Sequence, residues 1–286
     1  MKTILLLTDY TPASAHAAQY ALRLAKRINA NIIVSDSILV PERVLVPVGD
    51  AWRIELEAEL PQAQDKLAAM CYGMEQHLIA GTFPGSFVPG IYCQSGTLPV
   101  ADAINALEEN NAVTFIVLAA NLYYGSNSIM AGETCGKILA SSRTPVIAVP
   151  ESAPVRVAEK YTCITDITNN NGPYLSRLAD LASHSAAELM LVNINNGRPL
   201  DHEQEQALKA LMKEMINHVD YGRMYYRYIP NEAPETDMEW LFKCNRFEAL
   251  ALIYPKKDLY KRILRFDYQE RMVGNIDVPV LIFPAD

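Results

Sequence analysis

The segment ILLLTDYT, at Ile4–Thr11, returns later in the chain as YTCITDIT at Tyr161–Thr168. In both copies a short apolar run ends in the pattern T-D-x-T, and a longer stretch with periodic apolar residues follows. A short apolar run bounded by polar, turn-forming residues is typical of a buried strand. Because the similarity recurs between the two halves of the chain, it indicates two copies of one architecture.

The stretches after these two strands carry matching apolar stripes with the i, i+3, i+4, i+7 spacing of an amphipathic helix. The matching positions are Ala18, Ala21, Leu22, Leu24 and Ala25 in the first copy and Leu175, Leu178, Ala179, Leu181 and Ala182 in the second. Each copy is therefore predicted to begin with a strand and a helix that packs on it.

Both copies close with an apolar run bracketed by prolines, TPVIAVP ending at Pro150 and VPVLIFP ending at Pro284. Other continuous apolar runs, at Val113–Ala119 and Ala249–Tyr254, are typical of parallel strands covered on both faces by helices. We predict an α/β fold of two tandem doubly wound domains, each a five-stranded parallel sheet with helices on both faces.

The domain boundary is predicted in the short polar segment Glu151–Val157, so the domains span residues 1–152 and 157–286. The first copy is longer than the second. It adds a Pro- and Val-rich excursion at Val40–Val48, and then a long helix with apolar residues between Leu56 and Leu78.

Charge and composition exclude several classes of function. The formal net charge is −8, whereas phosphate binding by a nucleic-acid-binding protein needs an excess of Lys and Arg on one face. No window approaches the roughly 18 consecutive apolar residues of a membrane span. The opening MKTILLLTDYTP is interpreted as a strand and not as a signal peptide, so we expect a cytoplasmic protein without nucleic-acid or membrane partners.

The five cysteines are odd in number and scattered, without the close pairs of a thiolate metal site or a redox motif. We interpret them as small core residues. His16 lies near Asp9 at the start of the first predicted helix, where it is either a surface residue or turned toward the ligand edge. No nucleophile with a base, no paired carboxylates and no metal cluster were found, so an enzyme is not predicted.

In parallel sheets of this kind, ligands bind at the carboxyl ends of the strands, beside the first strand. This places Thr8, Asp9 and Thr11 of the first copy at the ligand edge, with Asp166 and Thr168 as their counterparts in the second. The alternative is that these residues only cap the following helix, which would contribute about 1 kcal/mol. The sequence leaves both interpretations open.

With these segments in order, the chain resembles the universal stress protein family. That family has a first strand ending in D-x-[ST], a sheet of order 3-2-1-4-5 and a closing strand that begins P-V, and it often occurs in tandem. The matches are D-Y-T at Asp9–Thr11, D-I-T at Asp166–Thr168, PVIAV at Pro145 and PVLIF at Pro279. The resemblance covers nearly the whole chain and implies the order 3-2-1-4-5 in each domain.

The ATP-binding branch of this family carries G-x-x-G-x9-G-[ST] after the fourth strand, where glycines let backbone N–H groups approach phosphate. In the first copy these glycine positions are Ala119, Leu122 and Gly132, and Glu133 replaces the hydroxyl residue. The second copy has no glycine at any of the three positions. The resemblance therefore implies a tandem, Rossmann-like member with degenerate nucleotide-binding loops.

We predict a non-catalytic stress-response or signalling protein without a cofactor. ATP is not expected in the second domain and is disfavoured in the first. The alternative is an adenine-nucleotide-binding stress protein, with weak ATPase activity not excluded by the sequence. Its non-standard site in the first domain would use Thr8, Asp9, Thr11, Gly125, Gly132 and Thr134.

The two domains are expected to pair within the chain through their fifth strands, Val146–Val149 and Val280–Phe283, because these runs are apolar and carry no charge against edge pairing. A homodimer is the alternative. Beyond this pairing, the expected partner is a small molecule or a protein that the sequence does not identify.

Overall fold

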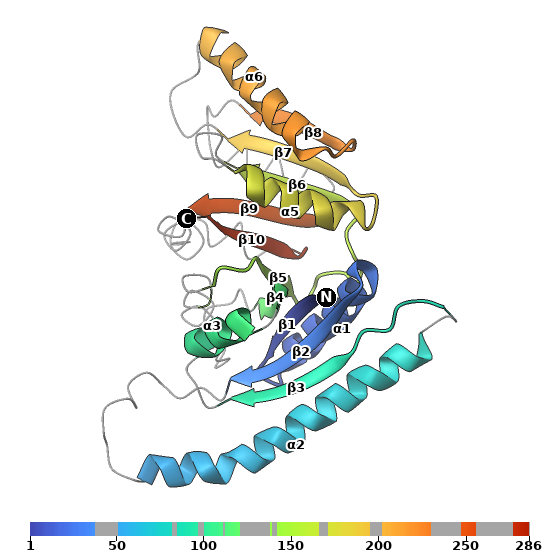
Figure 1. Ribbon diagram of the computed structural model, residues 1–286, viewed down its shortest axis with the longest axis vertical. Helices are drawn as coiled ribbons and strands as arrows, with labels where there is room; N and C mark the ends of the chain where they lie inside the picture. The colour runs from blue at the N-terminus through green and yellow to red at the C-terminus, as the bar shows by residue number, and fades with distance from the viewer. Residues whose placement is uncertain are drawn as a thin grey trace. The chain divides into compact units, whose positions relative to one another are not determined.

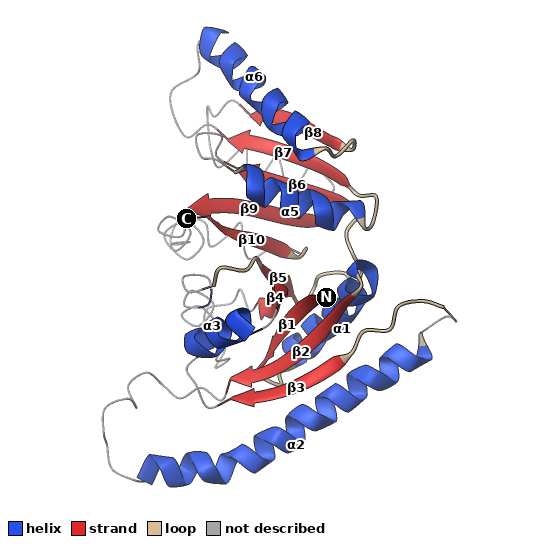
Figure 2. Ribbon diagram, in the orientation of Figure 1, coloured by secondary structure: helices blue, strands red, loops and turns tan. Residues whose placement is uncertain are grey.

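The computed structural model describes residues 1–37, 51–81, 85–96, 100–110, 112–120, 138, 142–165, 171–194, 202–229, 247–255 and 277–285. The chain divides into two compact units, Met1–Arg156 and Val157–Asp286. Strands and helices alternate over the first seven described elements of the first unit and the first five of the second, and both units consist of helices and strands (Figure 2). The result is a mixed α/β fold built on parallel strands.

The described elements of the first unit are β1 Lys2–Thr8, α1 Pro12–Ile28, β2 Ala30–Ser37, α2 Ala51–Ala80, β3 Ile91–Gly96, α3 Val100–Asn110, β4 Val113–Ala120 and β5 Val146–Pro150. Parallel pairings join β3 to β2, β2 to β1, β1 to β4 and β4 to β5. This is the strand order 3-2-1-4-5 that the resemblance implied. The central strand β1 is therefore flanked by β2 on one side and β4 on the other.

Local sequence explains where α1 begins and ends. Thr11 accepts a hydrogen bond from the free backbone N–H of Ser14, and Pro12 occupies the first turn, where no N–H is needed. At the other end, Lys26 and Arg27 are in the last turn, where positive charge is favourable, and Asn29 adopts the left-handed conformation, with φ 53°, that ends the helix. The predicted stripe from Ala18 to Ala25 is buried, as expected.

The described elements of the second unit are β6 Lys160–Thr165, α5 Gly172–Ser183, β7 Glu188–Ile194, α6 His202–Val219, β8 Met224–Ile229, β9 Ala249–Pro255 and β10 Val280–Ala285. Parallel pairings join β10 to β9, β9 to β6, β6 to β7 and β7 to β8. Numbered within its own unit, this order is 5-4-1-2-3, the order of the first unit with the opposite edge first. The stripe predicted on α5, from Leu175 to Ala182, is buried.

Helix α2 lies alongside β3, the strand at one edge of the first unit (Figure 1). Leu67, Cys71, Met74 and Leu78 are between 2% and 5% exposed, at the three- and four-residue spacing of one helix face. Figure 1 also shows that α2 runs along the length of β3. The long helix predicted between Leu56 and Leu78 is thus present.

The interpretation of the cysteines as isolated core residues is wrong for two of them. Cys71 of α2 and Cys93 of β3 form a disulfide, with 6.6 Å between their Cα atoms and 22 residues between them in sequence. Cys163 is fully buried, as expected of a small core residue, whereas Cys135 and Cys244 lie outside the described residues. The pairing was missed because a helix and a neighbouring strand bring together residues that no short motif connects.

Candidate functional site

Polar residues end three neighbouring strands of the first unit. The register of the sheet pairs Thr8 of β1 with Asp36 of β2, and Asp36 with Ser95 of β3. Residues in register on parallel strands project from the same face of the sheet, so these three side chains form one row at its carboxyl edge. Thr8 is only 4% exposed and Asp36 only 2%. This is the edge at which α/β sheets of this kind bind ligands.

The end of β1 and the turn that leads to α1 contain three of the six residues predicted for the first domain, Thr8, Asp9 and Thr11. Asp9 Oδ1 accepts hydrogen bonds from the Thr11 backbone N–H at 3.1 Å and from Thr11 Oγ1 at 2.6 Å. Thr11 Oγ1 in turn accepts from the Ser14 N–H at 3.2 Å. Thr8 Oγ1 donates to Ser14 Oγ and accepts from the Tyr10 N–H, each at 3.1 Å. These contacts support the capping interpretation of the T-D-x-T pattern.

Tyr10 is the residue of this turn that sequence reasoning passed over. Its φ of 61° is left-handed, a conformation that disfavours a residue with a side chain by roughly 1–2 kcal/mol. The hydroxyl donates a short hydrogen bond to Asp36 Oδ2 and lies 3.2 Å from the Ala63 carbonyl oxygen of α2. Tyr10 therefore connects the β1–α1 turn to the end of β2 and to α2.

Burial raises the pKa of Tyr10 well above its ordinary value, and the hydrogen bond to Asp36 and the negative charge of that carboxylate raise it further. The phenol therefore remains protonated and is the donor in this contact. Tyr10 is 36% exposed, so its ring forms part of the surface over the polar row.

Asp36 has one oxygen satisfied and one not. Oδ2 accepts from Tyr10, whereas Oδ1 is buried without a hydrogen-bond partner, and so is Oγ of the neighbouring Ser95. In the described part of the chain no Lys, Arg or His forms an ion pair with Asp36. A buried carboxylate normally has partners for both oxygens. The only sequence signal was the polar segment Ser35–Ser37 directly after the apolar run of β2.

The remaining predicted site residues lie in segments outside the described part of the chain. Gly125, Gly132 and Thr134 follow β4 in a segment outside the described residues, and so do Asp166 and Thr168 after β6. The excursion at Val40–Val48 lies outside them as well. The structure therefore brings Thr8, Asp9 and Thr11 together and leaves the loop residues as sequence predictions.

His16, the histidine considered for the ligand edge, makes a tertiary contact within the first unit. Its Nε2 lies 2.7 Å from the carbonyl oxygen of Ala153, in the segment that follows β5. This contact fastens the first turns of α1 to that segment. The role that the geometry shows for His16 is therefore structural.

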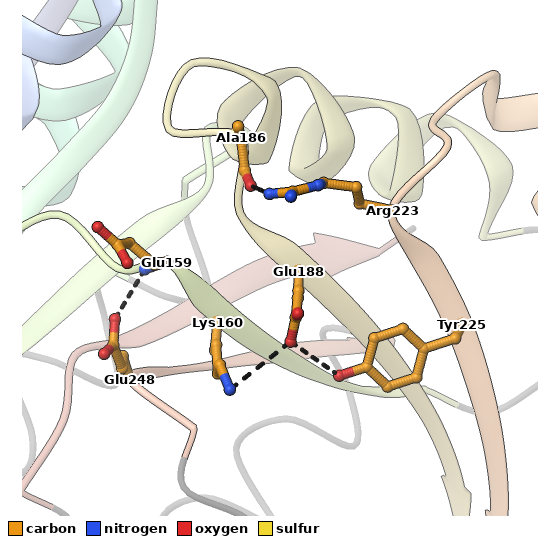
Figure 3. A network of polar contacts seen from close by, with 7 residues as sticks. All are labelled: Glu159, Lys160, Ala186, Glu188, Arg223, Tyr225 and Glu248. Atoms are coloured by element: carbon orange, nitrogen blue, oxygen red, sulfur yellow. Dashed lines mark hydrogen bonds and ion pairs between the residues drawn. The ribbon is translucent and has the colours of Figure 1, made fainter.

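In the second unit the polar contacts drawn in Figure 3 lie at the other ends of the strands. Lys160 Nζ lies 3.7 Å from Glu188 Oε2, to which Tyr225 also donates at 3.5 Å, and the Glu159 N–H donates to Glu248 Oε2 at 2.8 Å. Lys160 and Glu188 are about half exposed, so their ion pair contributes at most about 1 kcal/mol. This network joins the amino-terminal ends of β6, β7, β8 and β9, away from the edge predicted to bind ligands.

Two features of the described residues bear on function. Among them, no group of three or more His, Cys, Asp or Glu side chains is arranged to hold a metal ion. No helix among them combines the length and the apolar character needed to cross a membrane.

The fold and the polar edge define an α/β protein of parallel sheets whose first strand ends in a capped, hydrogen-bonded turn. The model of the universal stress protein family matches residues 1–150. The chain belongs to that family.

Solved structures agree on the fold. A universal stress protein from Archaeoglobus fulgidus DSM 4304 is 15% identical with a TM-score of 0.66, and the match covers 99% of this chain and 96% of that one. The cytoplasmic domain of a prokaryotic cation chloride cotransporter is 10% identical with a TM-score of 0.58, and the match covers 98% and 94%. At these identities the likeness establishes the fold alone. A comparison with curated proteins found no match.

Proposed function

We propose that this protein is a non-catalytic stress-response protein of the universal stress protein type, whose first unit does not bind ATP in the manner of the ATP-binding branch. The observation that carries this proposal is the β1–α1 turn, in which Thr11 donates to Asp9, and Thr8 and Thr11 are each hydrogen-bonded to Ser14. Their polar groups stabilise the start of α1.

The sequence after β4 supports the same conclusion. Ala119 and Leu122 stand where the branch has glycines, so their side chains would hinder the approach of backbone N–H groups to phosphate. Glu133 would add a negative charge beside a bound phosphate, and the two like charges would repel each other. We extend the proposal to the second unit as a tandem copy, in which none of the three glycines is present.

A second candidate function is adenine-nucleotide binding in the first unit through Asp9, Gly125, Gly132 and Thr134. One observation favours a ligand of some kind at this edge. Asp36 Oδ1 and Ser95 Oγ are buried without partners, and an amino group of a ligand could donate to either.

Thermal unfolding with and without millimolar Mg·ATP distinguishes the two candidates. A ligand at a hundred times its Kd would stabilise the fold by about 2.7 kcal/mol, which raises the Tm of a unit of this size by about 5–10 °C. We expect no shift, and no nucleotide in the purified protein by mass spectrometry. A shift of that size which Asp9→Ala abolishes, but Asp166→Ala does not, would establish the alternative.

A further inference from the structure

Two cysteines meet between a helix and an edge strand of the first unit. Cys71 lies in the buried stripe of α2, and Cys93 lies in the middle of β3. Their Cα atoms are 6.6 Å apart, within the range that a disulfide spans, and the two sulfurs are bonded. Among the described strands of its unit, β3 pairs with β2 alone, so this bond joins α2 to an edge strand.

The two cysteine residues differ in accessibility. Cys93 is exposed, whereas Cys71, on the buried face of α2, is only 4% exposed. Cys163 is a useful contrast, because it is fully buried and burial raises the pKa of its thiol far above the ordinary value. Oxidants and reductants react with accessible thiolates and disulfides, so Cys93 offers them a point of attack that Cys163 does not.

We propose that Cys71 and Cys93 are a reversible thiol–disulfide pair, and that their oxidation by a peroxide clamps α2 onto β3. Cys93 is the sulfur that reacts first, and Cys71 is the resolving sulfur. The pair does not depend on whether the first unit binds a nucleotide, so it goes beyond the proposed function.

The chemistry needs only hydrogen peroxide as the oxidant. The thiolate of Cys93 attacks one peroxide oxygen, so that an S–O bond forms, the O–O bond breaks and the leaving hydroxide takes up the proton that Cys93 released, giving water. The thiolate of Cys71 then attacks the sulfur of the resulting sulfenic acid. The S–S bond forms, the S–O bond breaks, and the departing hydroxide becomes a second water with the proton from Cys71.

Reduction returns the two thiols by exchange. A thiolate reductant attacks the sulfur of Cys93, the more exposed of the two residues, and the thiolate of Cys71 leaves and is protonated. A second reductant thiol then attacks the sulfur of the reductant in the mixed disulfide, so the Cys93 thiol is released and the reductant is oxidised to its own disulfide. Two electrons pass to the protein in each cycle.

The clamp acts close to the polar row at the carboxyl edge. Ala63, whose carbonyl oxygen lies 3.2 Å from the Tyr10 hydroxyl, precedes Cys71 by about two turns of α2. Between them the side chains of Gln64, Asp65 and Lys66 are exposed, and Leu67 is the first buried residue. The disulfide therefore limits the motion of the part of α2 that contacts Tyr10.

The test uses the full chain, reduced and then treated with hydrogen peroxide, with free thiols blocked by N-ethylmaleimide before digestion under non-reducing conditions. We expect a cross-linked peptide containing Cys71 and Cys93, and an intact mass, measured before the thiols are blocked, about 2 Da below that of the reduced protein. Dithiothreitol should restore both thiols without denaturant. The matched control Cys163→Ser should behave as the wild type.

Two variants test the order of the steps. In Cys71→Ser, peroxide should leave a sulfenic acid at Cys93 that dimedone traps, whereas in Cys93→Ser dimedone should label Cys71 far less. Hydrogen exchange should be several-fold slower across residues 60–78 in the oxidised wild type than in the reduced protein, and unchanged in α5.

Several results would overturn the proposal. One is the absence of the cross-linked peptide in excess peroxide while circular dichroism shows a folded protein. Another is a disulfide that dithiothreitol reduces only after denaturation, which would make it a permanent structural bond. Equal exchange across residues 60–78 in the two redox states would show that the bond does not clamp α2.

Discussion

The hydrogen bond between Tyr10 and Asp36 leads to a quantitative prediction. Tyr10→Phe removes the hydroxyl and keeps the ring and the left-handed backbone, so it isolates the loss of one donor. Asp36 is 2% exposed and its Oδ1 already has no partner, so the variant leaves a buried carboxylate without the hydrogen bond that Oδ2 now accepts. Hydrogen bonds to charged groups contribute about 1.5–3 kcal/mol. We therefore expect Tyr10→Phe to lower the free energy of unfolding by about 2–3 kcal/mol.

Urea denaturation followed by circular dichroism measures this loss, with an unchanged m-value as evidence that only stability has changed. The matched control is Tyr72→Phe, because Tyr72 lies on α2, the helix that Tyr10 contacts, and is 64% exposed. The control should stay within about 0.5 kcal/mol of the wild type. In a double-mutant cycle, Asp36→Asn should recover part of the loss in the Tyr10→Phe background, because it removes the buried charge.

An equal effect of Tyr10→Phe and Tyr72→Phe would refute this reasoning. It would mean that the carboxylate is as well satisfied without the phenol as with it. A coupling energy near zero in the cycle would lead to the same conclusion.

Other predictions follow from the same contacts. Thr11→Ala removes the cap of α1 and should cost about 1 kcal/mol in urea denaturation. Below pH 10 the Tyr10 phenol is protonated in both the folded and the unfolded protein. Because its pKa is raised in the folded protein, the free energy of unfolding should fall as the pH rises above 10. This fall should be less steep in Tyr10→Phe. The disulfide closes a loop of 22 residues, so Cys71→Ser/Cys93→Ser should lower the stability of the oxidised protein by about 3 kcal/mol, seen as a Tm lower by about 6–12 °C. Residues 1–155 expressed alone should self-associate in analytical ultracentrifugation if the fifth strands pair within the chain, and a monomer at high concentration would contradict that pairing.

The strands and helices could be predicted largely from local pattern. A buried parallel strand requires a continuous apolar run, and a helix that packs on a sheet requires a stripe, so the repeat at Ile4 and Tyr161 indicated both units. The capping role of Thr11 could also be foreseen, because it depends on residues three apart in sequence. The segment after β4 is different, because its predicted glycines lie outside the described residues and remain sequence predictions.

The sequence by itself determined the mixed α/β architecture of parallel strands and the polar ends of the first strands, because these follow from patterns within one element. Only the tertiary structure paired Tyr10 with Asp36 and Cys71 with Cys93. The first contact depends on the register between two parallel strands and on one left-handed turn, and the second on the rotation of α2 over the edge strand. Register and rotation are set by how whole elements pack against each other, and packing is a property of the folded chain that no local spacing records.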